Sequence, residues 1–65
     1  MAKINGAETR LSAPVTVGTY LAEHSYRPDR IAVELNGRIL PRQAYGTAML
    51  GDDDVMEIVS FVGGG

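Results

Sequence analysis

The sequence of 65 residues contains no cysteine and only one histidine, His24. Without cysteine the chain cannot form a disulfide, a thiolate metal site or a thiol nucleophile. A single histidine cannot build a multi-histidine metal site or a histidine relay. Ser12, Ser25 and Ser60 lack the Gly-x-Ser-x-Gly surroundings of a hydrolase nucleophile. The chain is therefore predicted not to be an enzyme on its own.

Long apolar runs and an excess of positive charge are also missing. No run approaches the roughly 20 residues needed to span a bilayer, and no hydrophobic signal-peptide segment follows Lys3. The formal net charge is −2, whereas a protein that neutralises nucleic-acid phosphates is normally basic. Neither common glycine-rich phosphate-binding loop is present. These absences predict a small cytoplasmic protein that binds neither nucleic acid nor membrane and acts through a protein partner.

Negative charge is concentrated in one run, Asp52-Asp53-Asp54. A calcium loop places its carboxylates at alternate positions, and this run does not. We therefore expect a solvated turn between two strands rather than a cation site. His24 is expected at the end of a helix, where a partly cationic side chain suits the helix dipole. No metal site and no bound cofactor are predicted.

The first half of the sequence predicts a hairpin followed by one helix. Asn5-Gly6 favours a type I′ turn between strands at residues 2–4 and 8–11, because both central residues of that turn need positive φ. Thr16 is the expected N-cap of the helix. Pro28 is expected to end it, since the residue before a proline disfavours the α region. The helix face expected to look inward carries Val17, Tyr20, Leu21 and His24.

The second half predicts two short paired strands and a longer last strand. Residues 31–35 alternate, with Ile31, Val33 and Leu35 on one face. Asn36-Gly37 then turns the chain back through residues 38–40. Residues 55–62 form the longest apolar-rich strand, and this length predicts a central place in the sheet. The connecting stretch 43–50 offers three residues to the core, namely Tyr45, Met49 and Leu50.

This order of elements predicts an α+β fold in which a mixed sheet of four to five strands packs on one main helix. A long last strand parallel to the first is the β-grasp, or ubiquitin-like, arrangement. We expect one domain over residues 1–62, with one thin core because the chain is short. A flexible tail is expected over residues 63–65.

The tail consists of Gly63, Gly64 and Gly65. Glycines bury no side chain and are costly to order, so we expect a thread that reaches roughly 10 Å when extended. Such a thread can enter a narrow channel of another protein and present the α-carboxyl of Gly65. The alternative is a flexible end or a cloning remnant without a role. The β-grasp pattern ahead of the glycines favours the functional interpretation.

Three stretches together resemble one known family. They are residues 31–42 (IAVELNGRILPR), Gly51-Asp52 followed by residues 57–59, and the closing residues 61–65 (FVGGG). On these motifs, and with the early Asn5-Gly6 hairpin, the chain resembles the ThiS family, the ubiquitin-like sulfur carriers of thiamin biosynthesis. The likeness extends over essentially the whole chain. The small subunit of molybdopterin synthase shares the fold and the Gly-Gly end, but it typically has a longer chain and a different segment before the tail.

The resemblance implies a carrier cycle in which Gly65 is chemically modified. A ThiF-like adenylyltransferase would use ATP and Mg²⁺ of its own to convert the Gly65 carboxylate into an acyl-adenylate. Activation is needed because an α-carboxyl with a pKa of about 3.3–3.7 is an anion at neutral pH and a poor electrophile. Sulfur delivered from a cysteine desulfurase would then replace AMP. The resulting thiocarboxylate would serve a ThiG-like thiazole synthase, so the carrier is a co-substrate that binds no cofactor itself.

Alternation on the last strand predicts which face of the sheet binds the partner. If Met56 and Ile58 point to the helix, Val55, Glu57, Val59 and Phe61 face away from it, which leaves Val59 and Phe61 as apolar residues on the open face beside the tail. An apolar patch with a charged rim is typical of an interface. The alternative for Phe61 is packing at the sheet edge or against Tyr45. The residues predicted to bind the partner are Ala32, Glu34, Val59, Phe61 and Val62.

Other functions remain open on the sequence alone. A ubiquitin-like protein modifier would form isopeptide adducts on lysines, and a passive β-grasp module would tolerate residues appended after Gly65. A sulfur carrier for molybdopterin is the alternative within the carrier class. The free chain is expected to be monomeric, because its acidic turn and charged rim offer no self-complementary patch.

Overall fold

The computed structural model describes residues 1–61. The predictions for Val62 and for the tail of residues 63–65 lie outside the described residues. In chain order the elements are β1 (Ala2–Ile4), β2 (Ala7–Thr9), β3 (Val15–Thr16), α1 (Val17–Glu23), the 3₁₀ turn η1 (Pro28–Arg30), β4 (Ile31–Leu35), β5 (Arg38–Leu40), the 3₁₀ turn η2 (Arg42–Ala44), β6 (Met49–Leu50) and β7 (Val55–Ser60).

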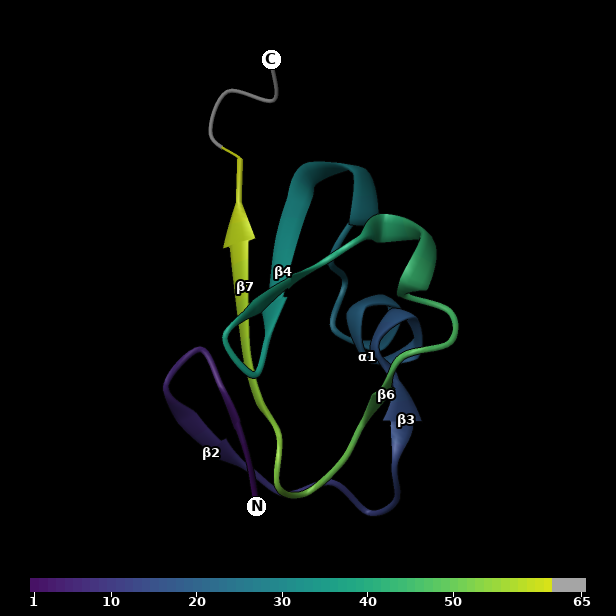
Figure 1. The fold of residues 1–65 in the computed structure, drawn as a ribbon. Helices are drawn as coiled ribbons and strands as arrows, with labels where there is room; N and C mark the ends of the chain where they lie inside the picture. Colours follow the sequence, from purple (N-terminus) through teal and green to yellow (C-terminus); the bar gives the residue numbers. More distant parts are fainter. Residues whose placement is uncertain (62–65) are drawn as a thin grey trace.

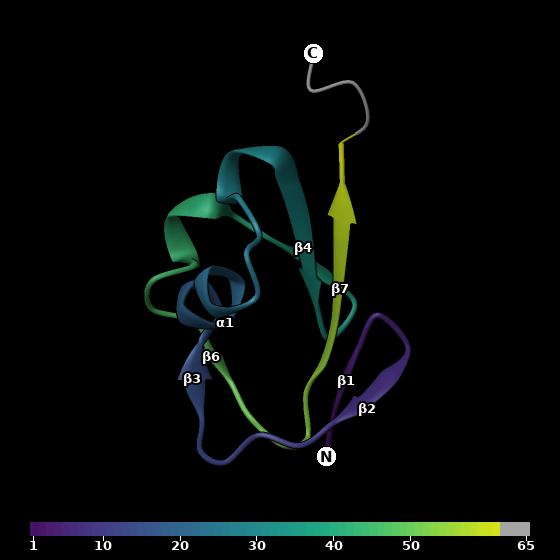
Figure 2. The same ribbon diagram turned by 180° about the vertical axis from the view of Figure 1, so that it is seen from behind.

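Five of the strands form one sheet in the order β2-β1-β7-β4-β5. The last strand, β7, is central, parallel to β1 and antiparallel to β4. Helix α1 lies on one face of this sheet, as the two opposite views show (Figures 1 and 2). The predicted β-grasp arrangement and the central place of the last strand are confirmed.

Both predicted hairpin turns are present. Asn5 and Gly6 have φ of 51° and 82°, and Asn36 and Gly37 have φ of 52° and 84°. Positive φ at both central residues is the requirement of a type I′ turn. The strand expected at residues 8–11 is instead β2, Ala7–Thr9, because the two-residue turn sets a register in which Ala7 already pairs with Ile4.

Helix α1 begins as predicted. The Thr16 hydroxyl oxygen accepts a hydrogen bond from the Thr19 N–H at 3.1 Å, which satisfies one of the free donors of the first turn. Two more of these donors are used by the segment before β6. The Val17 N–H donates to the Ala48 carbonyl at 2.9 Å, and the Gly18 N–H donates to the Tyr45 carbonyl at 2.8 Å.

The prediction that Pro28 ends the helix is wrong. The helix ends at Glu23, and Ser25 follows with φ of 64°. The Tyr26 N–H donates to the Leu21 carbonyl at 2.9 Å, and the Ser25 N–H donates to the Ala22 carbonyl at 3.2 Å. These two bonds form a Schellman motif, in which a left-handed residue closes the helix. The chain has therefore left the helix before the proline acts on it.

A second, two-stranded sheet pairs β3 with β6 and was not predicted. Strands of two residues are too short to show a period-2 pattern. This pairing turns Leu50 into the core and leaves Met49 51% exposed. The prediction that Met49 joins the core is therefore wrong, whereas Tyr45 and Leu50 are buried as expected.

The core lies between α1 and the inner face of the five-stranded sheet. Met56 and Ile58 of β7 point into it, and their neighbours Val55 and Glu57 point away. His24, placed on the inward helix face by its spacing, is exposed. It is the C-cap residue of α1, as its position at the helix end predicted, and its ring stacks on Tyr20 with the ring centroids 4.0 Å apart. The remaining core residues are Ala2, Ile4, Val17, Tyr20, Leu21, Ile31, Val33, Tyr45 and Leu50.

Candidate functional site

The outer face of the five-stranded sheet is the side opposite α1 (Figures 1 and 2). No helix or strand among residues 1–61 covers this outer face. Alternation along β7 places Val59 there with 58% of its surface exposed, and Phe61 beyond the strand is 53% exposed. The predicted orientation of β7 is therefore confirmed.

Strand pairing brings the outer-face residues of β4 and β7 together. Ala32 lies opposite Val59, and Glu34 lies opposite Glu57. Residues directly opposite in an antiparallel pair have Cβ atoms about 4.5–5.5 Å apart. They line an open groove of about 370 Å³, whose wall is completed by Val33 and Ile39. Ala32, Glu34 and Val59 of the predicted partner-binding set thus share one groove.

The predicted set omits the buried Val33 and two exposed groove residues, Ile39 and Glu57. Ile39 of β5 lies opposite Glu34 and is 70% exposed. A signal for both was available, because the two-residue turn at Asn36-Gly37 fixes the register of β4 with β5. Counting outward from that turn pairs residue 34 with residue 39. Glu57 shares the strand phase of Val59, so alternation alone places it on the same face.

Phe61 extends the line of β7 beyond its last strand residue. Its N–H donates to the Arg30 carbonyl at 2.9 Å, so the backbone still pairs alongside the chain that enters β4. The ring remains half exposed, and Phe61 is not a member of the core that contains Tyr45. Phe61 therefore places an aromatic side chain on the surface directly before residues 62–65.

The acidic run forms a turn, as predicted. The Asp54 carboxylate accepts hydrogen bonds from the Gly51 N–H at 2.7 Å and from the Asn36 side-chain amide at 2.9 Å. Asp54 thus ties the turn to the β4–β5 hairpin. Within residues 1–61 no group of three or more His, Cys, Asp or Glu side chains is placed to hold a metal ion. No helix in that range is long and apolar enough to cross a membrane.

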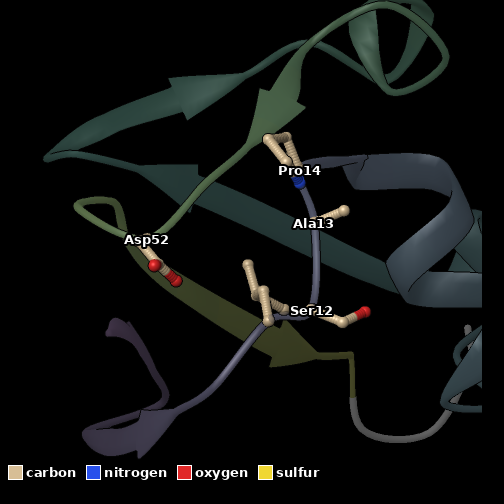
Figure 3. A pocket seen from close by; sticks show the side chains of 5 residues that line it. Ser12, Ala13, Pro14 and Asp52 are labelled. Atoms are coloured by element: carbon tan, nitrogen blue, oxygen red, sulfur yellow. The ribbon is translucent and has the colours of Figure 1, made fainter.

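A second hollow, of about 160 Å³, lies between the chain before β3 and the acidic turn. Figure 3 shows Asp52 on one side of it and the segment carrying Ser12, Ala13 and Pro14 on the other. This segment and the acidic turn lie at the end of the molecule where β7 begins (Figure 1). The hollow is therefore separate from the outer-face groove, and it brings together no group of catalytic side chains.

Comparison with known proteins identifies the family of the chain. The family model described as the ThiS family matches residues 2–65. The chain belongs to the ThiS family. This confirms the resemblance seen in the three sequence stretches, and the match extends through the closing glycines, Gly63, Gly64 and Gly65.

Individual family relatives agree in sequence and in fold. The sulfur carrier protein ThiS of Bacillus subtilis (strain 168) is 35% identical over 66 residues, which cover 100% of both chains. The crystal structure of ThiS from Geobacter metallireducens superposes with a TM-score of 0.84 at 28% identity, covering 98% of this chain and 97% of that one. The fold and the family therefore agree.

One relative is a much longer protein. The thiazole synthase of Paramagnetospirillum magneticum (strain ATCC 700264 / AMB-1) is 42% identical over 62 residues. These residues are 95% of this chain but 19% of the thiazole synthase. The chain therefore spans about a fifth of the length of this relative.

Proposed function

We propose that this protein is a cytoplasmic sulfur carrier for thiazole formation in thiamin biosynthesis and that it carries sulfur as a thiocarboxylate on Gly65. The observation that carries the proposal is the end-to-end match to the sulfur carrier protein ThiS of Bacillus subtilis, which covers 100% of both chains. The fold supports it, because β7 is the central strand beside an uncovered sheet face and Phe61, which follows it, precedes Gly65 by four residues in the sequence.

The proposed cycle first activates the Gly65 carboxyl and then replaces one of its oxygens by sulfur. A carboxylate oxygen of Gly65 attacks the α-phosphate of ATP bound by a ThiF-like adenylyltransferase, which releases pyrophosphate and forms the acyl-adenylate. The outer sulfur of a persulfide formed by a cysteine desulfurase then attacks the acyl carbon and displaces AMP. A thiol reductant cleaves the resulting S–S bond, which releases the thiocarboxylate and leaves a disulfide. ATP and Mg²⁺ belong to the adenylyltransferase. The carrier supplies the acyl group and is regenerated as a carboxylate after it gives up its sulfur.

The proposed acceptor of this sulfur is a ThiG-like thiazole synthase. A segment similar to nearly all of this chain is part of one polypeptide named thiazole synthase in Paramagnetospirillum magneticum. Because this segment and the rest of that thiazole synthase form one polypeptide, we expect this chain to bind a thiazole synthase that is a separate protein. We place Ala32, Glu34, Val59 and Phe61 at the surface used for docking, together with Val62 and the tail residues Gly63 and Gly64.

The decisive experiment alters Gly65 alone. Deleting Gly65, or adding one residue after it, should abolish ATP–pyrophosphate exchange by the adenylyltransferase, because one residue displaces the acyl carbon by roughly 3.3–3.6 Å. The melting temperature should not change. Intact-mass spectrometry of the unmodified carrier, treated with the enzyme and a sulfur source, should show oxygen replaced by sulfur. Full exchange activity of the Gly65 deletion would overturn the proposal.

A docking role for Phe61 is tested separately. Phe61→Ala should raise the KM for the carrier while leaving kcat and the melting temperature close to the unmodified values. Met49→Ala is the matched control, because Met49 is also about half exposed but lies in the separate β3–β6 sheet. A large loss of stability in Phe61→Ala would instead assign this side chain to packing.

A further inference from the structure

The outer-face groove has two carboxylates at its centre. Glu34 of β4 and Glu57 of β7 lie directly opposite each other in the sheet. The neighbour of Glu34 on the other side is Ile39. Like charges placed directly opposite one another destabilise a sheet, so this pair lowers the stability of the free protein. Folding does not explain why two glutamates face each other here, whereas a role of this pair in binding a partner would explain it.

The outer face of β1 carries one cation, Lys3, and the strand register places Lys3 opposite a different carboxylate. Lys3 of β1 lies opposite Glu8 of β2 on one side and opposite Val55 of β7 on the other. Glu57 is therefore only a diagonal neighbour of Lys3, while Glu8 faces it directly. In the strand register, the direct neighbours of Glu34 and Glu57 supply no positive charge.

Two exposed apolar side chains lie next to the two carboxylates. Ile39 is the cross-strand neighbour of Glu34, and Val59 is the next outer-face residue after Glu57 along β7; both are more than half exposed. An arginine side chain matches this arrangement, because its aliphatic stem packs on apolar walls and its planar guanidinium binds carboxylates through several N–H donors. A groove of about 370 Å³ has room for one such side chain.

We propose that the groove between Ile39 and Val59 receives an arginine from an apolar surface of the activating adenylyltransferase, and that Glu34 and Glu57 bind its guanidinium together. The inference rests on the proposed function, because it assigns the surface by which that enzyme holds the carrier. The groove is continuous with Phe61 through Val59 on β7, so an enzyme seated in it also reaches the residues that lead to Gly65.

The experiment separates docking from folding by changing charge without changing shape. Glu34→Gln/Glu57→Gln should raise the KM for the carrier in ATP–pyrophosphate exchange by about tenfold or more, with kcat unchanged. The KM of the double variant should also respond less to added salt, because fewer charges are screened. Its melting temperature should stay equal or rise. Glu23→Gln, at the end of α1 on the other side of the sheet, is the matched control.

Charge reversal sharpens the test. Glu57→Lys places a cation opposite Glu34, so it should raise the melting temperature and at the same time weaken enzyme binding more than Glu57→Gln does. If Glu57 had only a structural role, Glu57→Lys would change the melting temperature and the affinity for the enzyme in the same direction. A KM for the double Gln variant equal to that of the Glu23→Gln control would overturn the proposal.

Binding is also measured without chemistry, so that the groove and the role of Gly65 are judged separately. The carrier lacking Gly65 is titrated into the adenylyltransferase by calorimetry, with and without the Glu34→Gln/Glu57→Gln change. Weaker binding of the changed protein supports the arginine groove even if Gly65 is not the acceptor. Equal binding overturns the groove while leaving the carrier function intact. A dimer of the unmodified chain in sedimentation that the double change disrupts would assign the groove to a second copy and also overturn the proposal.

Discussion

Asn5 and Asn36 hold the two sides of β7 in the same way. The Asn5 side-chain carbonyl accepts a hydrogen bond from the Ile58 N–H at 2.6 Å, and the Asn36 side-chain carbonyl accepts one from the Val55 N–H at 2.8 Å. The backbone N–H of each asparagine also donates to β7, Asn5 to the Met56 carbonyl at 2.9 Å and Asn36 to the Val55 carbonyl at 2.7 Å. Each hairpin turn is thus bonded to the central strand.

In both turns the side chain replaces a backbone group. If β1 and β4 continued, the parallel and antiparallel ladders would present the backbone carbonyls of residues 5 and 36 to these same β7 N–H groups. Both residues are in the left-handed region instead, where the chain turns. Asparagine supplies a second carbonyl on its side chain and tolerates positive φ. Asparagine suits these two positions better than glycine, because each position needs both a positive φ and a side-chain carbonyl that accepts a hydrogen bond from β7.

Replacement by glycine keeps the positive φ, so Asn5→Gly isolates the side-chain hydrogen bond to β7, whereas Asn36→Gly also removes the hydrogen bond to Asp54. Asn5→Gly should lower the free energy of unfolding by about 1–3 kcal/mol, since it leaves the partly buried Ile58 N–H without its acceptor. Asn36→Gly should lower the free energy of unfolding by less, because both bonds of its side chain, to the Val55 N–H and to Asp54, are exposed and water can replace them. Urea unfolding measures both, and amide exchange at Ile58 should accelerate only in Asn5→Gly. Equal losses in the two variants would contradict this account.

Ser25→Gly should stabilise the protein by about 0.5–1 kcal/mol. Ser25 closes helix α1 with φ of 64°, a conformation that costs residues with a Cβ about 1–2 kcal/mol. Part of the relief is lost to the greater freedom of glycine in the unfolded chain. Ser25→Ala is the control, and it should gain nothing because it keeps the Cβ. Thermal melts of the unmodified protein and the two variants test this prediction. A rise in melting temperature as large in Ser25→Ala as in Ser25→Gly would refute the explanation by positive φ.

Gly18→Ala should not raise the free energy of unfolding by the roughly 1 kcal/mol that alanine normally contributes over glycine inside a helix. A Cβ at Gly18 would lie 3.1 Å from the Tyr45 carbonyl oxygen, which is held in place as the acceptor of the Gly18 N–H. We expect a lower melting temperature. Gly46→Ala is the matched control, because a Cβ there meets nothing within 4 Å, and it should be neutral or stabilising. A higher melting temperature for Gly18→Ala would show that this contact relaxes freely.

Alkaline pH should destabilise the protein through Tyr20. Burial, with a smaller contribution from nearby Tyr26, raises the pKa of Tyr20 above its ordinary value of 10.0. Above that value the unfolded chain releases the phenolic proton while the folded protein retains it, so stability is intact below pH 10 and falls as the pH rises further. Melts between pH 8 and 11 should show a shallower fall for Tyr20→Phe than for the unmodified protein or the control Tyr26→Phe. Parallel curves for all three would contradict the prediction.

The parts of the fold that depend on local chemistry were predictable. The two Asn-Gly turns, the Thr16 cap and the alternation of residues 31–35 each act within a few neighbouring residues, and each is found in the structure. The errors concern features that depend on distant contacts. Strands β3 and β6 exist because residues 15–16 and 49–50 meet across the fold. A serine that closes a helix in place of glycine carries no local signal of its own.

The candidate site was predicted to a similar degree. Alternation correctly placed Val59 and Glu34 on the outer face. Alternation also placed Glu57 on this face, but Glu57 was not included in the partner-binding set. Ile39 was missed, because its place follows from counting pairs across the β4–β5 hairpin. The opposition of Glu34 and Glu57 is a relation between strands that are separated in sequence, and it becomes visible only once the register of β4 and β7 is known.

The central place of β7 also determines how the protein bears mechanical load. When β7 is pulled at Phe61 along the strand axis, neighbours on both sides resist the pull, β1 through a parallel ladder and β4 through five register pairs. All these hydrogen bonds are then loaded in shear, so they must yield together. A strand at the sheet edge, pulled at right angles to its axis, would give way one bond at a time. In the proposed cycle, an enzyme that draws the glycines into its channel could therefore exert tension along β7 without peeling this strand from the sheet.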